Sequence, residues 1–244
     1  IAPHDSIERY TNLGVDVVKG YGKLIDPWTV EIKLNDGGTQ TLTARTIVIA
    51  TGARPFVPPL PGIEETGYVT SDTLWDKFAA LDEAPKKLVV LGGGPIGSEL
   101  AQSFARLGSS VTQIEMAERI MIKEDLEVST FAHEALTESG VNILTSHQAL
   151  RCEARDGKKY IVVKHNDKEI DIECPYQFTH VAAHQGWYAA VNGLFGHLKK
   201  FKVDYRVIPW TTFIDPEVAR VGLNEQDAKD KGIDYEITRF ESEE

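Results

Sequence analysis

The sequence has few cysteines and no long apolar run. Its two cysteines, Cys152 and Cys174, lie 22 positions apart, which fits neither a CxxC redox motif nor a four-ligand metal site. Two thiols in no such pattern suit a reducing cytoplasm. No apolar stretch approaches the roughly 20 residues that a membrane helix needs. We therefore expect a cytoplasmic protein with no bound metal and no membrane partner.

Basic residues are also in short supply. The chain has 26 Lys and Arg against 37 Asp and Glu, a formal net charge of -11. An acidic surface does not attract nucleic acid or an anionic membrane, so neither is expected as a partner. Hydrophobic residues make up 42% of the 244 residues, enough for a globular core. The chain begins at Ile1 without an initiator Met or a basic-then-apolar leader, which indicates the interior of a longer protein.

The first part of the chain alternates like short strands joined by turns. Its apolar-polar alternation predicts strands at Val15–Lys19, Thr29–Leu34 and Thr39–Ala44, and the apolar run Thr46–Ala50 predicts a strand buried on both faces. The proline-rich segment Pro55–Pro61 can be neither helix nor central strand, so it marks a domain boundary.

The central part has the pattern of a parallel sheet. It predicts, in order, strand Lys87–Leu91, helix Pro95–Leu107, strand Val111–Glu115, helix Asp125–Ser139 and strand Val141–Leu144. This β-α-β-α-β order is typical of a parallel sheet with right-handed crossovers. An antiparallel meander is expected over 149–173, after which no strand returns to the sheet.

A glycine motif lies between the first of these strands and its helix. Gly92, Gly94 and Gly97 match G-x-G-x-x-G, which is weak alone but specific after a strand and before a helix. Gly92 makes the tight turn, Gly94 lets a pyrophosphate approach the backbone, and Gly97 allows close helix–strand packing. With Ile96, these residues are the predicted dinucleotide contacts at the helix N-terminus. The alternative is a glycine turn that binds nothing.

Two acids complete the predicted site. Glu115 ends the next strand, where it is expected to accept hydrogen bonds from both adenosine-ribose hydroxyls, which favours NAD over NADP. Arg119 and Lys123 follow and could instead approach a 2′-phosphate. Glu99, placed in the first turn of the helix, is either a catalytic residue near the nicotinamide or an ordinary acid favoured by the helix dipole.

Four further segments carry a family resemblance: 46–55 (TIVIATGARP), 70–72 (TSD), 178–182 (FTHVA) and 213–222 (FIDPEVARVG). They resemble the class I pyridine nucleotide–disulfide oxidoreductases, which include mercuric reductase and dihydrolipoamide dehydrogenase. The resemblance implies an α/β fold: a Rossmann-like NAD(P)-binding domain with part of an FAD-binding domain and the start of an α+β dimerisation domain. It also implies FAD contacts at Thr51, Gly52 and Thr179, and a homodimer that acts on a small-molecule or disulfide substrate.

The resemblance divides the chain into four parts. These are 1–72 for part of the FAD domain, 73–174 for the NAD(P) domain, 175–203 for a return helix expected at Phe178–Phe195, and 204–244 for the start of the dimerisation domain. The last part is expected to contain strands at Val207–Phe213 and Ala219–Val221. His180 and His184 have helical metal-ligand spacing, but no third ligand accompanies them.

The sequence departs from the resembling family in ways that bear on function. It has no first glycine fingerprint for FAD, no C-x4-C redox disulfide, no Gly-Asp flavin motif and no C-terminal His-Glu pair, and Cys174-Pro175 joins two regions that the family separates. We expect residues to be missing there. The intact protein is then an FAD-dependent NAD(P)H:disulfide-type oxidoreductase and the 244-residue chain is inactive alone. The alternatives are a non-catalytic nucleotide-binding fragment, or a flavin NADH oxidase or ferredoxin-type reductase. The electron acceptor stays open.

The missing motifs generate a spectroscopic prediction. A flavin held only by the Thr51-Gly52 turn and one further segment lacks a pyrophosphate cradle, so the purified 244-residue chain should carry no flavin. Its visible absorption spectrum checks this directly. A stoichiometric flavin absorption band, which gives a protein solution a yellow colour, would contradict this prediction.

Overall fold

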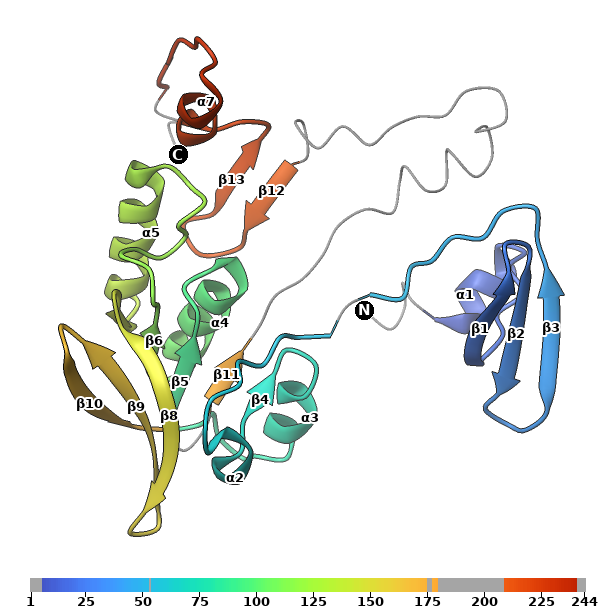
Figure 1. Cartoon of the computed structure of the whole chain (residues 1–244), viewed down its shortest axis with the longest axis horizontal. Coiled ribbons are helices and arrows are strands. Elements are labelled where there is room, and N and C mark those ends of the chain that lie inside the picture. The colour runs from blue at the N-terminus through green and yellow to red at the C-terminus, as the bar shows by residue number, and fades with distance from the viewer. Residues whose placement is uncertain (1–5, 53, 175–176, 180–208, 241–244) are drawn as a thin grey trace. The chain divides into compact units, whose positions relative to one another are not determined.

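The computed structural model describes residues 6–52, 54–174, 177–179 and 209–240 (Figure 1). Within them, residues 6–51 form one compact unit, and the described residues from 52 onward form a second, larger one. No helix in these ranges is both long and apolar enough to cross a membrane.

The first unit is a short helix with a three-stranded antiparallel sheet. It contains α1 (Ile7–Asn12), β1 (Gly20–Asp26), β2 (Thr29–Leu34) and β3 (Thr39–Thr43), in the sheet order β1-β2-β3. The expected second and third strands are confirmed, but the first begins at Gly20, after the predicted Val15–Lys19. The turn explains the shift. Asp26 Oδ1 accepts the Trp28 N–H at 2.8 Å and pairs Asp26 with Thr29, which sets Gly20 opposite Leu34.

The buried strand predicted at Thr46–Ala50 is not formed. These residues have no strand structure, and the side chains of Val48 and Ile49 are 51% and 68% exposed. A parallel strand needs neighbours on both edges to satisfy its backbone groups. Among the described residues, no strand lies beside this segment. The Pro55–Pro61 connector has neither helix nor strand structure, as expected.

The second unit is built on a five-stranded parallel sheet with the order β4-β11-β5-β6-β7. The predicted β-α-β-α-β order is confirmed, with element ends shifted by at most one residue. The elements are α2 (Ile63–Thr66), β4 (Val69–Thr70), α3 (Leu74–Ala79), β5 (Lys87–Leu91), α4 (Pro95–Arg106), β6 (Ser110–Ile114), α5 (Leu126–Glu138) and β7 (Asn142–Leu144).

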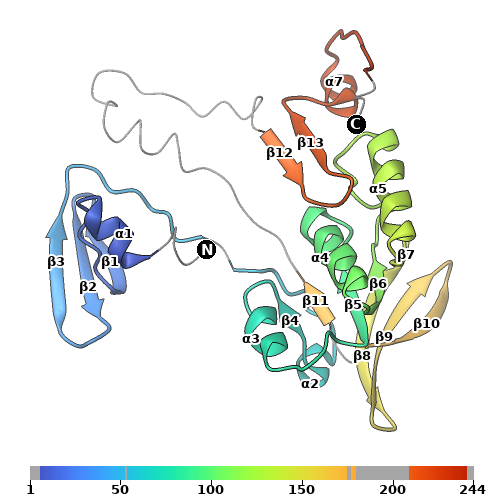
Figure 2. The same cartoon turned by 180° about the vertical axis from the view of Figure 1, so that it is seen from behind.

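The sheet is covered differently on its two faces. Leu88 and Val90 of β5 pack with α4 and α5, which lie along one face (Figure 2). Val89 and Ile114 pack with the meander on the other face. Successive side chains of a strand point to opposite faces, so an apolar run such as β5 serves both layers. The meander consists of β8 (Gln148–Arg155), β9 (Lys158–His165) and β10 (Lys168–Glu173).

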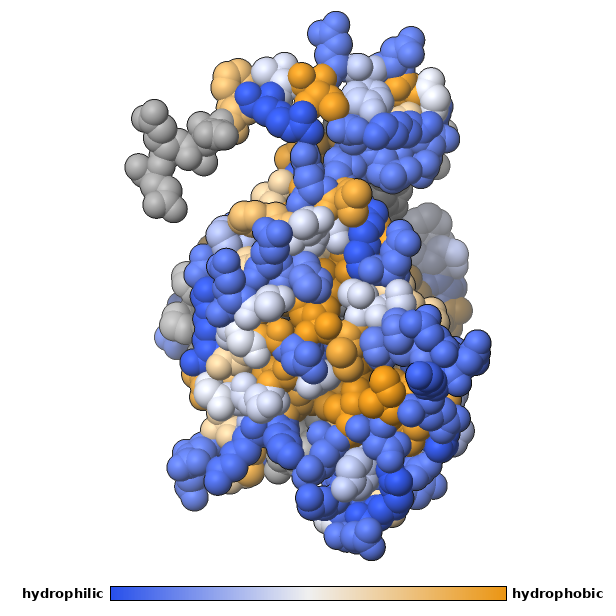
Figure 3. Space-filling model, turned by 90° about the vertical axis from the view of Figure 1, so that its left-hand side faces the viewer, coloured by the Kyte–Doolittle hydropathy of each residue, from blue (hydrophilic) through white to orange (hydrophobic). Residues whose placement is uncertain are grey.

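One side of this unit has an exposed apolar patch. Figure 3 shows apolar residues gathered at the centre of the side that α5 and β10 occupy in Figure 1, with hydrophilic residues around them. The exposed large apolar side chains of the unit include Met116, Ile122, Leu126, Phe131 and Ile170. Exposed apolar patches of this kind often mark contact surfaces.

A short strand takes the place where the sequence predicts none. β11 (Gln177–Thr179) pairs in parallel with both β4 and β5, so a strand does return to the sheet after the meander. Phe178 and Thr179 are therefore in a strand, where a helix start was expected. An open sheet edge beside β5 leaves backbone groups unpaired, and a neighbouring strand satisfies them. Pro175 and Tyr176, at the predicted omission, lie outside the described residues, as does the rest of the expected helix.

The C-terminal segment forms a hairpin and a helix. β12 (Pro209–Thr212) pairs antiparallel with β13 (Val218–Val221), as expected for this region, and α7 (Glu225–Lys231) follows. Asn224 and Asp227 form a capping box at the start of α7, and Gly232 ends it in the left-handed conformation. This segment packs directly against the rest of the second unit, because Ile214 and Val218 belong to the core cluster that also contains Ala101 and Phe104 of α4.

Because α5 is buried on one side only, alanine substitutions along it should differ in how much they lower the free energy of unfolding. Leu136 is fully buried, so Leu136→Ala should lower the free energy of unfolding by about 2–5 kcal/mol. Leu126→Ala, at the exposed start of the same helix, should change it by less than about 0.5 kcal/mol. Urea unfolding of both variants measures the difference. Equal losses would show that α5 does not pack as described.

Candidate dinucleotide-binding site

The glycine loop joins β5 to α4 with a backbone suited to a ligand. Gly92 has a φ of 108°, which only glycine adopts without strain. Gly94 is the N-cap of α4, is exposed, and has extended backbone angles. Because Gly94 has no side chain, no side chain caps the first turn of α4. The first-turn N–H groups are the unpaired groups that bind phosphates at helix N-termini.

Gly97 is required by a close approach within the protein. A Cβ atom at this position would lie 2.3 Å from the Gly92 carbonyl oxygen, far inside contact distance. A side chain there would push α4 away from the loop. The role predicted for the third glycine, close helix–strand packing, is the geometry that the structure has.

Glu115 lies at the tip of β6, next to the glycine loop. Its carboxylate accepts the Gly93 N–H at 2.6 Å and the Ala117 N–H at 2.7 Å. A Cβ atom on Gly93 would lie 3.1 Å from the Glu115 side chain. The structure therefore brings together the two motifs that the sequence places 22 residues apart, and fixes a negative charge beside the loop.

The sequence analysis missed Gln113, which supports the loop from below. Gln113 is fully buried in β6, and its Nε2 donates to the Gly92 carbonyl at 3.0 Å and to Ser98 Oγ at 3.2 Å. It thereby ties the loop and the first turn of α4 to the next strand. A glutamine between the apolar residues Val111 and Ile114 was the available signal, because parallel strands are buried on both faces.

Arg119, the first basic residue after Glu115, is less available than the sequence suggests. The Arg119 guanidinium donates to the Glu124 carbonyl at 2.7 Å and to the Ile122 carbonyl at 3.1 Å. These bonds hold the loop that follows β6 in a closed turn. Moving Arg119 toward a 2′-phosphate would leave both carbonyls without this donor.

The other predicted site residues are spread over the chain. Glu99 is the fifth residue of α4, beyond the first turn where it was expected because one turn holds only 3.6 residues. Its carboxylate accepts the Phe213 N–H at 2.9 Å. Ile96 lies half-buried in the first turn. Thr51 and Gly52 are exposed at the junction of the two units, and Thr179 lies in β11. Their roles in flavin contact, and that of Glu99 in catalysis, stay predictions.

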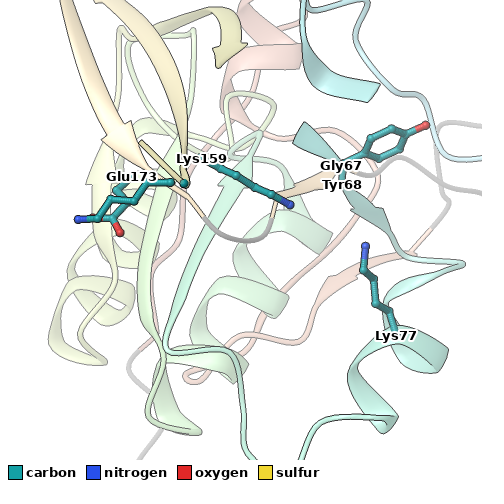
Figure 4. Close-up of a pocket in the computed structure, with 7 residues that line it drawn as sticks. Gly67, Tyr68, Lys77, Lys159 and Glu173 are labelled. Carbon is teal, nitrogen blue, oxygen red and sulfur yellow. The ribbon is translucent and has the colours of Figure 1, made fainter. Parts of the chain in front are cut away.

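Two hollows on the second unit lie away from the glycine loop. One, of about 400 Å3, is lined by Gly67, Tyr68, Lys77, Gly157, Lys158, Lys159 and Glu173. The Lys77 and Lys159 side chains extend toward the backbone of Gly67, whereas the Tyr68 ring points away (Figure 4). None of these residues belongs to the glycine motif. A dinucleotide site of this type is a backbone surface at strand ends rather than a deep cavity, so its chemistry identifies it better than its volume.

The described residues offer no cluster suited to a metal ion. No group of three or more His, Cys, Asp and Glu side chains with that arrangement occurs among them. Cys152 and Cys174 are buried on the meander side of the sheet. His180 and His184 lie outside the described ranges.

Comparisons with known proteins find matches over nearly the whole chain. The family model described as pyridine nucleotide-disulphide oxidoreductase matches residues 3–205, and the model of that family's dimerisation domain matches residues 208–244. The mercuric reductase of Staphylococcus aureus is 32% identical, covering 96% of this chain and 50% of the relative. The dihydrolipoyl dehydrogenase of Geobacillus stearothermophilus is 31% identical, covering 93% of this chain and 57% of the relative.

Solved structures show the same fold. The HOCl-induced flavoprotein disulfide reductase RclA from Escherichia coli superposes with a TM-score of 0.70 at 23% identity, over 93% of this chain and 62% of that one. The chain spans about half the length of the curated relatives it matches. The alignment with the S. aureus enzyme runs over 286 positions, more than the 244 residues of this chain, so the relative has residues without a counterpart here. The chain belongs to the pyridine nucleotide-disulphide oxidoreductase family.

Proposed function

We propose that this chain binds a pyridine dinucleotide across the glycine loop and the tip of β6. The observation that carries the proposal is the Glu115 carboxylate, held by the Gly93 and Ala117 N–H groups beside an uncapped helix start. In this arrangement the exposed backbone at Gly94 and the first turn of α4 would hold the pyrophosphate. Glu115 would accept hydrogen bonds from the adenosine ribose. The bound nucleotide would supply hydride for transfer, and the protein would orient it and exclude water.

NADH is the proposed nucleotide, in preference to NADPH. A 2′-phosphate at the ribose position would face the Glu115 carboxylate, and like charges brought together at an interface cost on the order of several kcal/mol. Arg119 is held by two carbonyls of its own loop, which removes the nearest basic residue that could balance the phosphate. Gly97 permits the close helix–strand packing of NAD sites.

The parent protein, on this proposal, is an FAD-dependent NAD(P)H oxidoreductase that acts as a homodimer on a small-molecule or disulfide substrate. The division into 1–72, 73–174, 175–203 and 204–244 remains our proposed domain assignment. The aligned length of the relatives supports the absence of some internal residues from this chain, and their place at Cys174-Pro175 is part of the proposal. The described residues do not form a flavin site: Thr51 and Gly52 supply one turn, and the sequence has no second glycine cradle. We therefore assign no flavin-dependent step to this chain. A non-catalytic nucleotide-binding role fits the 244-residue chain by itself better than catalytic activity does.

A single methyl group tests the phosphate site. A Cβ atom on Gly94 would meet no protein atom within 4 Å and the backbone there is extended, so Gly94→Ala should fold and lose no more than the roughly 1 kcal/mol by which alanine is a poorer N-cap than glycine. The methyl group would stand where the pyrophosphate approaches, so the NADH dissociation constant should rise at least about tenfold, or about 1.4 kcal/mol. Isothermal titration calorimetry measures it.

Gly22→Ala is the matched control, because a Cβ atom there meets only the Val30 side chain at an ordinary 3.6 Å in a strand of the first unit. Its NADH affinity should equal that of the wild type. Unchanged affinity in Gly94→Ala would remove the pyrophosphate from this backbone and overturn the proposed site.

A second prediction concerns nucleotide choice. The wild-type chain should bind NADH more tightly than NADPH, and Glu115→Gln should narrow the difference because it removes the charge that repels the 2′-phosphate. Glu118→Gln, an exposed acid on the same loop, should leave the preference intact. Dissociation constants for both nucleotides in the three proteins decide the matter. Tighter NADPH binding by the wild type would reverse the assignment, and an unchanged preference in Glu115→Gln would exclude Glu115 as its cause.

A further inference from the structure

The helix that begins at the glycine loop also holds the C-terminal segment. Gln102, on α4, is only 4% exposed. Its Nε2 donates to the Asp215 carbonyl at 2.7 Å, and its Oε1 accepts the Asp215 N–H at 2.7 Å. The amide side chain thus pairs with the backbone of a residue 113 positions away, as a neighbouring strand would. A buried polar side chain with both groups satisfied fixes one arrangement of the parts that it joins.

Further contacts run along the same helix. Glu99 accepts the Phe213 N–H at 2.9 Å, and Arg106 Nη1 lies 2.7 Å from Asp215 Oδ2. Ile214 is 3% exposed and packs into the core cluster that includes Ala101 of α4. Figures 1 and 2 both show β12 and β13 beside the α4 end of this unit. The packing of residues 209–240 against α4 and the loop after β6, here called the seating of the C-terminal segment, therefore depends on the position of α4.

A second connection runs through the loop after β6. The Met121 N–H donates to the Gly93 carbonyl at 2.7 Å, so the loop is bonded directly to the glycine motif. A Cβ atom on Gly93 would lie 2.7 Å from Ile120 Cγ2, which shows how closely the two segments pack. The fully buried Ile120 is held in turn by Ser129 Oγ, which donates to its carbonyl at 2.6 Å. The glycine loop cannot shift without moving residues 119–125.

Charged side chains within residues 119–125 form hydrogen bonds and an ion pair with the C-terminal segment. The Asp125 carboxylate accepts the N–H groups of Glu225 at 3.0 Å and Gln226 at 2.9 Å, at the start of α7. Asp125 is the N-cap residue of its own helix α5, but its side chain forms no cap bond there. Arg220 Nε lies 3.1 Å from a Glu124 carboxylate oxygen, with both side chains mostly buried.

This charged contact is partly desolvated. Burial raises the pKa of the Glu124 carboxyl, and the positive charge of Arg220 opposes that rise. Arg220 Nη1 also donates to Asp227 Oδ2 at 3.0 Å. Replacing one partner of such a buried ion pair would leave the other charge unpaired, so Glu124 and Arg220 depend on each other while the two segments are in contact.

We propose that dinucleotide binding and the seating of residues 209–240 are energetically coupled, with Gln102 and Asp125 as the positioning residues. The inference rests on the proposed function. The glycine loop and the start of α4 touch the ligand at one end, and the same helix and the loop after β6 hold the C-terminal segment at the other. A ligand that fixes the loop reduces the freedom that seating has to remove, and a seated segment preorganises the loop for the ligand. Such coupling is reciprocal by thermodynamic necessity.

Two substitutions separate the connections. Gln102→Met keeps the side-chain length but loses both bonds to Asp215, and Asp125→Asn keeps the shape but replaces one acceptor oxygen by an NH2 group facing a backbone N–H. Each should raise the NADH dissociation constant of the 244-residue chain at least about fivefold, the lower range of typical allosteric coupling. Arg239→Gln is the control. It removes an exposed ion pair with Glu127, at 3.0 Å, between the same segment and α5, and exposed pairs contribute little.

The reciprocal measurement needs no variant. Saturating NADH should slow amide hydrogen exchange of the wild-type segment 209–231 at least about fivefold, measured by mass spectrometry, and leave the first-unit strands β1–β3 unchanged. Circular dichroism confirms that each variant is folded, and Asp125→Asn decides alone if Gln102→Met does not fold. Equal NADH affinity in wild type and folded variants, or unchanged exchange of 209–231, overturns the coupling while the proposed function stands. A wild-type chain that binds no NADH overturns both.

Discussion

The distance between Gly97 and the Gly92 carbonyl sets the position of α4, and most of the second unit is arranged around that helix. A side chain at Gly97 would come within 2.3 Å of that oxygen, so the helix can lie this close to the end of β5 only with glycine there. Gln113 then fixes the same carbonyl from the neighbouring strand. With its start held from two directions, α4 can present first-turn N–H groups to a ligand at one end and buried side chains to the C-terminal segment along its length.

The position of α4 links binding chemistry with assembly. Phosphate recognition at a helix N-terminus needs a rigid backbone, because the N–H groups must point at the ligand before it arrives. The core cluster supplies that rigidity, and Ile214 and Val218 of the C-terminal segment are part of it. The segment that the family model identifies as dimerisation domain is therefore packed into the same core as the nucleotide helix. On the proposed function, assembly and nucleotide binding would share one set of packed side chains.

The first unit shows what happens when neighbours are lacking. Residues 20–43 form a hairpin sheet because their partners are adjacent in sequence. The apolar run Thr46–Ala50 needs partners from elsewhere, and in the described residues it stays extended and exposed. Curated relatives are about twice as long as this chain, which accords with an apolar strand whose sheet lies in a larger protein. Local patterns specify hairpins, whereas a buried parallel strand is specified by contacts distant in sequence.

The sequence by itself determined the β-α-β-α-β order of residues 87–144, the position of the glycine loop and the family. Apolar periodicity, and glycine and proline at fixed positions, are local signals, and they predicted Lys87–Leu91 to the residue and α4 to within one residue. Only the tertiary structure decided which distant groups meet. It placed the Glu115 carboxylate on the Gly93 N–H, engaged Arg119 in its own loop, paired Gln102 with Asp215, and placed Gln177–Thr179 between two strands. Each of these depends on the direction of a side chain or the register of a strand across long sequence separations, and neither leaves a periodic trace in the chain.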